Sequence, residues 1–164
     1  MLDREGTMAS DQDYRFFHSI EVRYRDVDPQ RHVNSATYFT YMEQARAKYL
    51  QALGLWSGED FDAIGIILAE QSCTYMKAFR YGQVVEVGVR VSRLGRKSFD
   101  VSYSLREQAS GEEYARGNTV LVAYDYRRGQ SMPIPEAWRQ ILARHEGHVP
   151  GDPASRKEAD HDEV

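Results

Sequence analysis

Residues 24–46 read YRDVDPQRHVNSATYFTYMEQAR, and within this stretch the chain changes from a strand pattern to a helix pattern. Around its start, apolar and charged side chains alternate, which predicts a strand over residues 16–26. From residue 37 to about 53, apolar side chains recur every three or four positions, which predicts an amphipathic helix. Asn34 and Ser35 precede this helix and are the candidates for its N-cap.

Beyond this helix the pattern is mainly that of β-strands. Four extended segments are expected, and they cover residues 64–79, 84–94, 98–107 and 114–126. A short helix is expected over 136–145. The order is thus a strand, a long helix, four strands in a meander and a small helix. We therefore expect an α+β fold in which an antiparallel β-sheet wraps around one long central α-helix.

The length and composition are those of one ordinary globular domain, with 164 residues of which 41% are hydrophobic and 28% charged. We expect this domain to cover residues 14–146, with disordered polar segments at 1–13 and 147–164. No apolar run is long enough to cross a bilayer, and the N-terminus lacks an apolar signal-peptide core. We expect a cytoplasmic protein that does not bind membranes. The net charge of −4 also disfavours non-specific binding to nucleic acid.

Cys73 is the only cysteine, so the chain cannot form an intramolecular disulfide or a zinc site built from a cysteine cluster. It lies in an alternating segment without a nearby histidine. This setting favours a half-buried strand residue over a catalytic nucleophile.

The junction between the first strand and the helix carries the densest chemistry. Asp26 and Asp28 are two residues apart, and Pro29 ends the strand pattern. The start of the helix offers backbone N–H groups that stabilise an oxygen gaining negative charge. A carboxylate beside it can attack a carbonyl carbon or activate a water molecule. Spacing alone leaves open that Asp28 merely ends the strand and accepts loop N–H groups, because Asp-Pro loops before helices are common.

This segment resembles the hotdog-superfamily thioesterases, specifically the 4-hydroxybenzoyl-CoA thioesterase and YbgC-like group. Their pattern is a strand ending in Asp-x-Asp, an HVN-type loop and a helix reading Tyr-x-x-Tyr-x-Glu-x-Ala-Arg. The matching residues here are Asp26, Asp28, 32–34, Tyr38, Tyr41, Glu43, Ala45 and Arg46. The stretches YMKAFRYGQVVEV and RLGRKSFDVSYSL extend the resemblance, which covers roughly residues 20–143. It implies the hotdog fold, an antiparallel sheet around one long helix.

The resemblance also implies roles for residues at this junction. Asp28 takes the place of the catalytic carboxylate, and the backbone N–H of Ser35 that of the oxyanion donor. The residues expected to contact the acyl group are Tyr24, His32, Asn34 and Tyr38.

The chain also departs from the family pattern at this junction. The YbgC-like branch has histidine at the position of Ser35, so a histidine general base is not carried over to His32. Gln30 and Arg31 stand in the loop where glycine is common.

A basic turn at Arg96, Lys97 and Ser98 is the candidate for binding coenzyme A, because its charges suit phosphate groups. Solvated surface is the equally open alternative for this turn. The resemblance implies an acyl-CoA thioesterase that forms a homodimer or homotetramer. It needs no metal or redox cofactor, and coenzyme A enters only as part of the substrate. The alternatives are a non-catalytic acyl-CoA-sensing module and an enoyl-thioester hydratase.

Overall fold

The computed structural model describes residues 14–60, 62 and 65–147. The segments expected to be disordered, 1–13 and 147–164, lie outside these residues except for Gly147. The elements are β1 (Phe16–Glu21), the 3₁₀ turn η2 (Tyr24–Asp26), α1 (Thr37–Ala52), β2 (Ile66–Tyr75), β3 (Val84–Leu94), β4 (Ser98–Glu107), β5 (Glu113–Asp125), β6 (Gln130–Ser131) and α2 (Glu136–Glu146).

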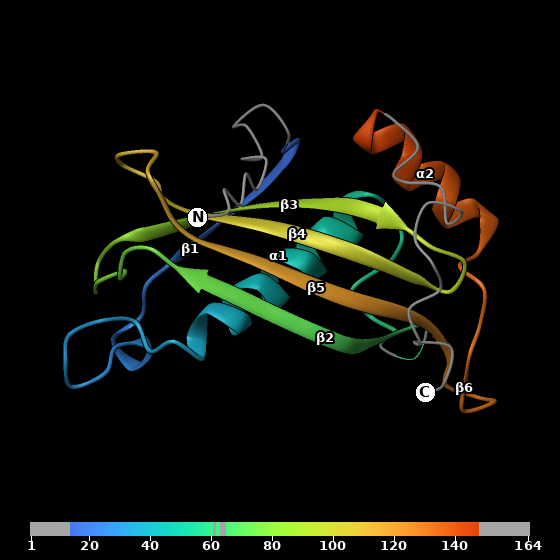
Figure 1. Ribbon diagram of the computed structural model, residues 1–164, viewed down its shortest axis with the longest axis horizontal. Helices are drawn as coiled ribbons and strands as arrows, with labels where there is room; N and C mark the ends of the chain where they lie inside the picture. Colours follow the sequence, from blue (N-terminus) through green and yellow to red (C-terminus); the bar gives the residue numbers. More distant parts are fainter. Residues whose placement is uncertain (1–13, 61, 63–64, 148–164) are drawn as a thin grey trace, which may run out of the picture.

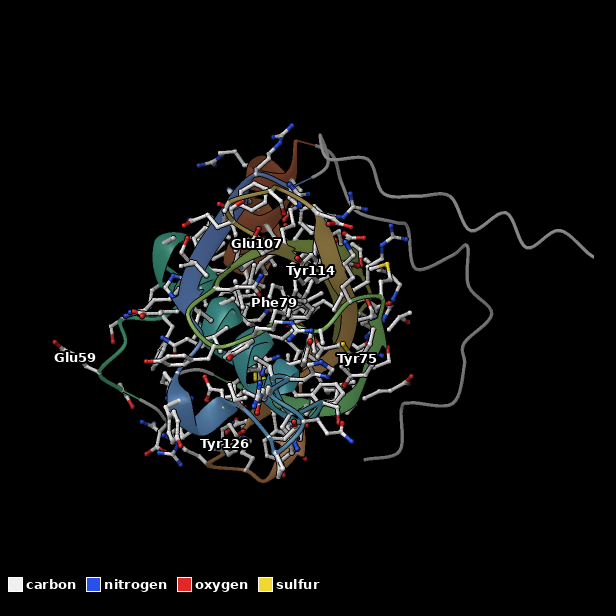
Figure 2. The ribbon with its side chains drawn as sticks, turned by 90° about the vertical axis from the view of Figure 1, so that its left-hand side faces the viewer. Glu59, Tyr75, Phe79, Glu107, Tyr114 and Tyr126 are labelled. Carbon is white, nitrogen blue, oxygen red and sulfur yellow. The ribbon has the colours of Figure 1, made fainter. Side chains whose placement is uncertain are left out.

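The sheet is antiparallel and wraps around α1. Its strand order is β1–β3–β4–β5–β2, and the short β6 pairs with β5. Figure 1 shows α1 running behind the sheet, and Figure 2 shows strands on both sides of the helix. The expected α+β hotdog fold is therefore confirmed. The limits of β3 and β4 are those that the alternation predicts.

The strand order corrects the expectation of a four-strand meander. Only β3, β4 and β5 follow one another in the sheet, whereas β2 pairs with the far side of β5. The alternation of a strand identifies the face that it buries but not the neighbour along its edge, so the sequence pattern did not distinguish the two orders. As a result, β1 and β2 form the two edges of the described sheet.

The first strand ends earlier than the predicted range of 16–26. The Asp26 carboxylate accepts the backbone N–H of Arg23 at 3.0 Å and closes the chain into η2. Asp26 and Asp28 therefore do not lie on one continuing strand.

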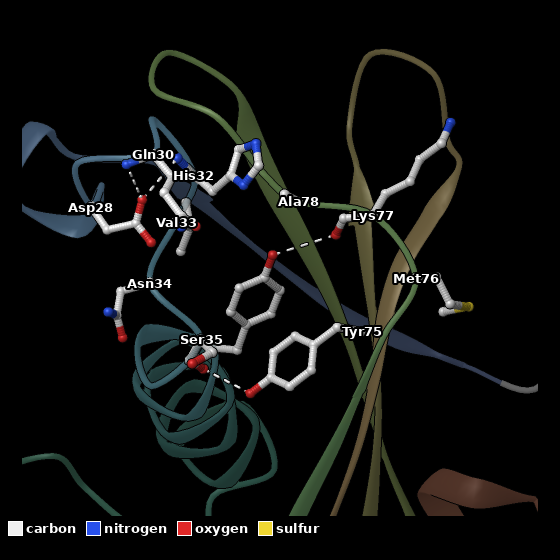
Figure 3. Close-up of a pocket in the computed structure, with 11 residues that line it drawn as sticks. Asp28, Gln30, His32, Val33, Asn34, Ser35, Tyr75, Met76, Lys77 and Ala78 are labelled. Atoms are coloured by element: carbon white, nitrogen blue, oxygen red, sulfur yellow. Dashed lines mark hydrogen bonds between the residues drawn. The ribbon is translucent and has the colours of Figure 1, made fainter.

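The second strand ends at Tyr75, before the predicted limit at residue 79. Met76 and Lys77 both donate their backbone N–H to the carbonyl of Tyr114, at 2.9 and 3.0 Å. Two donors on one acceptor interrupt the regular ladder, and the chain turns out of the sheet toward the start of α1 (Figure 3).

The core lies between α1 and the concave face of the sheet. The buried side chains of α1 are Tyr38, Tyr41, Met42, Ala45, Tyr49 and Leu50. They meet the inward-facing rows of β3 and β4, which are Val85, Val87, Val89, Val91, Phe99, Val101, Tyr103 and Leu105. On β5 the inward position opposite Met42 is Gly117, where a Cβ would overlap the methionine sulfur. This glycine lets α1 approach the sheet closely.

The second helix, α2, is fastened to the far end of the sheet. The buried carboxylate of Glu146 accepts the hydroxyl of Tyr49 at 2.6 Å and the backbone N–H of Val91 at 2.9 Å. Val91 stands where a bulge interrupts the pairing of β3 with β4. Within the described part of the chain, no helix combines the length and apolar character needed to span a membrane.

Candidate active site

The chain between η2 and α1 folds into a narrow loop. Val27 and Val33 form an antiparallel bridge. The N–H of Asp28 donates to the carbonyl of His32 at 2.8 Å, and the N–H of Arg31 donates to the carbonyl of Asp28 at 2.9 Å. Arg31 has a φ of +65°, the left-handed conformation that glycine adopts most easily. Arginine thus makes the turn for which the resembled family commonly has glycine.

Asp28 holds this loop with one carboxylate oxygen and leaves the other open. Its Oδ1 accepts the backbone N–H groups of Gln30 at 2.9 Å and His32 at 3.3 Å (Figure 3). Its Oδ2 accepts no hydrogen bond from any residue that the structure describes. The side chain is half-buried and lines a pocket of about 370 Å³. Asp28 therefore fulfils the structural role and keeps one oxygen available for chemistry.

The start of α1 presents an open backbone donor to the same pocket. The Asn34 side chain accepts the N–H of Ala36 at 2.9 Å, and its carbonyl accepts that of Thr37 at 2.9 Å. The N-cap position of α1 is Ala36, so the prediction of Asn34 or Ser35 as N-cap is wrong, and Asn34 instead forms a turn just before the helix, which begins at Thr37. Ser35 lines the pocket, and its N–H donates to none of the described residues. An unpaired N–H at a helix start is suited to binding a partly negative oxygen.

The opposite wall of the pocket comes from the end of β2 and the segment after it, which sequence reasoning missed. The added lining residues are Tyr75, Met76, Lys77 and Ala78. They reach the loop because the N–H of Val33 donates to the carbonyl of Phe79 at 2.8 Å. The YMKAFRYGQVVEV match was the available signal for this segment, but a contact between residues 46 positions apart in sequence is not encoded in local spacing.

Two tyrosines join this wall to the helix start. The Tyr75 hydroxyl donates to the carbonyl of Ser35 at 2.8 Å, and the Tyr38 hydroxyl accepts the N–H of Phe79 at 3.2 Å. The Tyr38 and Tyr75 rings meet edge to face with centroids 4.8 Å apart. Burial raises the pKa of both phenols, that of Tyr75 to about 12 with a further contribution from Cys73. Both hydroxyls therefore stay neutral at ordinary pH.

Of the other predicted acyl-contacting residues, His32 and Asn34 line the pocket with Tyr38, but Tyr24 does not. Tyr24 is 85% exposed, and its ring lies edge-on against Tyr81 with centroids 6.1 Å apart. The reason is η2, which turns the chain at Tyr24 out of the sheet.

The basic turn at residues 96–98 lies at the opposite end of β3 and β4 from the pocket (Figure 1). There the Lys97 ammonium approaches the Ser131 hydroxyl at 3.4 Å, and the Ser98 hydroxyl accepts a hydrogen bond from Arg93 at 2.9 Å. Within a single chain, the basic turn and Asp28 therefore lie at opposite ends of the sheet and do not form one site.

The remaining candidates for chemistry are the lone thiol and a possible metal cluster. Cys73 is a half-buried residue of β2, as predicted, and burial raises the pKa of its thiol. No cluster of three or more His, Cys, Asp or Glu side chains suited to a metal ion occurs in residues 14–60, 62 and 65–147.

The chain is similar in sequence and in fold to known proteins. The family model described as the thioesterase-like superfamily matches residues 22–142. A thioesterase from Thermus thermophilus, solved in complex with coenzyme A and Zn, is 34% identical, with a TM-score of 0.73 over 84% of this chain and 98% of that one. The PA5185 protein from Pseudomonas aeruginosa strain PAO1 is 31% identical, with a TM-score of 0.72 over 81% and 92% of the two chains. The protein YsmA of Bacillus subtilis (strain 168) is 28% identical over 129 residues, which are 79% of this chain and 86% of YsmA.

Proposed function

The chain belongs to the thioesterase-like superfamily, and on that premise we propose that this thioester hydrolase acts on acyl-coenzyme A with Asp28 as its catalytic carboxylate. One observation carries the proposal. Asp28 and Ser35 line the same pocket, and each keeps one polar group without a partner among the described residues, a carboxylate oxygen and a backbone N–H. The reaction converts the thioester and water into a carboxylic acid and free coenzyme A.

Thioester hydrolysis requires an attacking group and a donor for the carbonyl oxygen. The N–H of Ser35 stabilises the negative charge that develops on this oxygen, aided by the positive end of α1. Asp28 either adds to the acyl carbon itself or takes a proton from the water that adds. By either route the carbon–sulfur bond breaks and the sulfur leaves as a thiolate. If Asp28 itself has added, water then hydrolyses the resulting anhydride, which releases the carboxylic acid and restores the carboxylate. His32, Asn34 and Tyr38 then contact the acyl group from the pocket wall.

Coenzyme A is bound, in this proposal, between two copies of the chain. The turn at residues 96–98 is separated from the Asp28 loop by the length of β3, about 30 Å for ten strand steps. Antiparallel pairing of the β2 edges of two copies would bring the turn of one chain toward the loop of the other. The outer edge of β2 pairs with no described strand, and Leu68 and Tyr75 on β2 are 43% and 45% exposed.

This arrangement makes a homodimer the smallest complete unit, and a homotetramer two such units. The Thermus thermophilus relative was solved with coenzyme A, which supports the assignment of this ligand class. Sedimentation of the full chain gives the association state directly.

Two other functions remain alternatives to hydrolysis of acyl-coenzyme A. A module that binds acyl-coenzyme A without catalysis would release no thiol from any acyl group. An enoyl-thioester hydratase would act on an unsaturated acyl-coenzyme A and release no thiol from a saturated one. The open oxygen of Asp28 favours a catalytic site over the binding module, and the match to the thioesterase-like family favours hydrolysis over hydration.

The test measures thiol release from short, long and aromatic acyl-coenzyme A by the wild-type chain and by Asp28→Asn. The variant keeps an oxygen that accepts the N–H groups of Gln30 and His32, so the loop retains its shape. We expect kcat to fall by about 10²–10⁴, since the attacking carboxylate is lost.

A matched control is Asp125→Asn. Asp125 accepts the backbone N–H groups of Arg127 and Arg128 at 2.9 and 3.1 Å and does not line the pocket. The kcat of Asp125→Asn should therefore equal that of the wild-type chain. Full activity of Asp28→Asn would disprove the assigned mechanism. If the wild-type chain releases no thiol from any acyl group, the binding module replaces the hydrolase.

A further inference from the structure

Asp26 is a buried acid that the proposed reaction does not use. It is 3% exposed, and its Oδ2 accepts the hydroxyl of Tyr41 at 2.8 Å and the backbone N–H of Arg23 at 3.0 Å. Its Oδ1 accepts Nη2 of Arg23 at 2.8 Å. Tyr41 belongs to α1 and is 1% exposed. Asp26 therefore connects the residues before the Asp28 loop to the interior of the helix that follows it.

The backbone of Asp26 also holds the far side of the loop. Its carbonyl accepts the N–H of Asn34 at 2.9 Å. The next two steps along the loop are the bridge between Val27 and Val33 and the bond from Asp28 to His32. Asp26 thus anchors both arms of the loop, the segment that leads away from it and the segment that returns to it.

The two groups assigned to catalysis lie on opposite arms of this loop. Asp28 follows Asp26 on the first arm, and Ser35 follows Asn34 at the end of the second arm. The distance between the open carboxylate oxygen of Asp28 and the open N–H of Ser35 therefore depends on the position of Asp26 relative to α1. The Tyr41–Asp26 hydrogen bond sets that placement from inside the core.

We infer that Asp26 and Tyr41 form a positioning pair that holds the Asp28 loop in register with the start of α1, so that the carboxylate and the oxyanion donor face one bound carbonyl. This inference rests on the function proposed above. Tyr41 touches neither substrate nor reacting atoms in this assignment. It acts through Asp26.

The charge states of the pair suit this role. Burial opposes ionisation of Asp26, but the hydrogen bonds from Arg23 and Tyr41 outweigh it and hold the pKa of the carboxyl below its ordinary value. Burial, reinforced by the Asp26 charge, raises the pKa of Tyr41. At ordinary pH the pair is therefore a neutral hydroxyl donating to a carboxylate, a stronger bond than one between neutral groups.

The same helix provides a matched comparison for a purely structural role. Tyr49 is also 1% exposed on α1, and its hydroxyl also donates to a buried carboxylate, that of Glu146 at 2.6 Å. It lies eight residues further along, about 12 Å from Tyr41 at the rise of an α-helix. If buried tyrosine–carboxylate bonds only stabilise the fold, Tyr41→Phe and Tyr49→Phe should behave alike.

The experiment compares the full-length wild-type chain with Tyr41→Phe, Tyr49→Phe and Asp28→Asn. Steady-state kinetics use the acyl-coenzyme A that the wild-type chain hydrolyses fastest, with rates expressed per folded chain. We expect Tyr41→Phe to lower kcat at least tenfold, about the effect of a small misplacement of reacting groups, and to change KM less than about threefold. We expect Tyr49→Phe to keep kcat within about twofold of wild type.

A second readout does not depend on turnover. Exchange of the Asn34 amide hydrogen reports the bond to the Asp26 carbonyl, and it should accelerate in Tyr41→Phe but not in Tyr49→Phe. Asp26→Asn adds a further check, because a pair acting as one unit gives a double variant with Tyr41→Phe no slower than the worse single variant.

The positioning pair is overturned if Tyr41→Phe keeps wild-type kcat, if the two tyrosine variants lose kcat equally, or if Asn34 exchange is unchanged. Its failure is distinct from failure of the proposed function. A wild-type chain without thiol release disproves the hydrolase, while amide exchange still decides whether the pair holds the loop. An active Asp28→Asn disproves the role of Asp28 alone.

Discussion

Replacement of Gly117 by alanine tests how closely α1 packs on the sheet. A Cβ at this position would overlap the sulfur of Met42 and lie 3.0 Å from its Cε and 3.3 Å from the carbonyl oxygen of Ser72. Met42 is 1% exposed, so its side chain cannot swing into solvent. Either the methionine adopts a poorer rotamer or α1 moves away from β5. Overpacking of this kind costs about 1–3 kcal/mol.

The sign of the effect makes this prediction sharp. Gly117 has no left-handed backbone angle, so alanine fits its conformation. Without the overlap, alanine would stabilise the chain by about 0.4–1 kcal/mol, because it restricts the unfolded chain more than glycine does. We expect instead a net destabilisation of about 1–2 kcal/mol, which lowers Tm by roughly 2–8 °C for a domain of this size.

Urea unfolding at one fixed protein concentration measures this free energy. Met42→Ala supplies the control, since it removes the overlapping atoms and alone costs about 2–5 kcal/mol through the cavity it leaves. The double variant should be less destabilised than the sum of the two single variants. A Gly117→Ala chain as stable as wild type, or more stable, would refute the close packing of α1 on β5.

Two further predictions concern charge. The free energy of unfolding should decrease as the pH falls below about 4, because the folded-state pKa of Asp26 lies below its ordinary value of 3.8. That stabilisation is complete above the ordinary value and is lost as pH drops through the folded pKa, so urea titrations at decreasing pH that show a flat profile contradict it. Lys97→Ala should raise KM for acyl-coenzyme A about fivefold at unchanged kcat, since one ionic contact of a half-buried lysine contributes roughly 1 kcal/mol. The control is Lys48→Ala, at an exposed lysine. If Lys97→Ala leaves KM unchanged at low salt, Lys97 does not belong to the binding site.

Much of the fold was predictable because it rests on local periodicity. The alternating valines of β3 and the three- and four-residue spacing from Tyr38 to Tyr49 report the buried face of each element directly. The place of β2 in the sheet was not predictable in this way. It depends on pairing between Tyr75 and Ala115, which no local pattern encodes.

In the candidate site, too, only the residues that are neighbours in sequence were predictable. Asp28, Asn34 and Ser35 are neighbours in sequence, so the motif located their side of the pocket. The wall at Tyr75 reaches them only through the turn after β2, and the 3₁₀ turn that exposes Tyr24 depends on the Asp26 carboxylate. Such hydrogen bonds between specific side chains and backbone carry no periodic signal.

The fastening of α2 has a consequence for how the protein is made. The carboxylate of Glu146 accepts hydrogen bonds from Val91 at the bulge of β3 and from Tyr49 on α1. These two residues are synthesised roughly fifty and a hundred residues earlier. Likewise β2 lies next to β5, whose residues emerge after those of β3 and β4. A nascent chain therefore carries β2 without its neighbour until β5 has been translated, and Tyr49 and Val91 lack their shared carboxylate acceptor until α2 follows. Pairing between such distant segments predicts slower folding than local contacts alone would give.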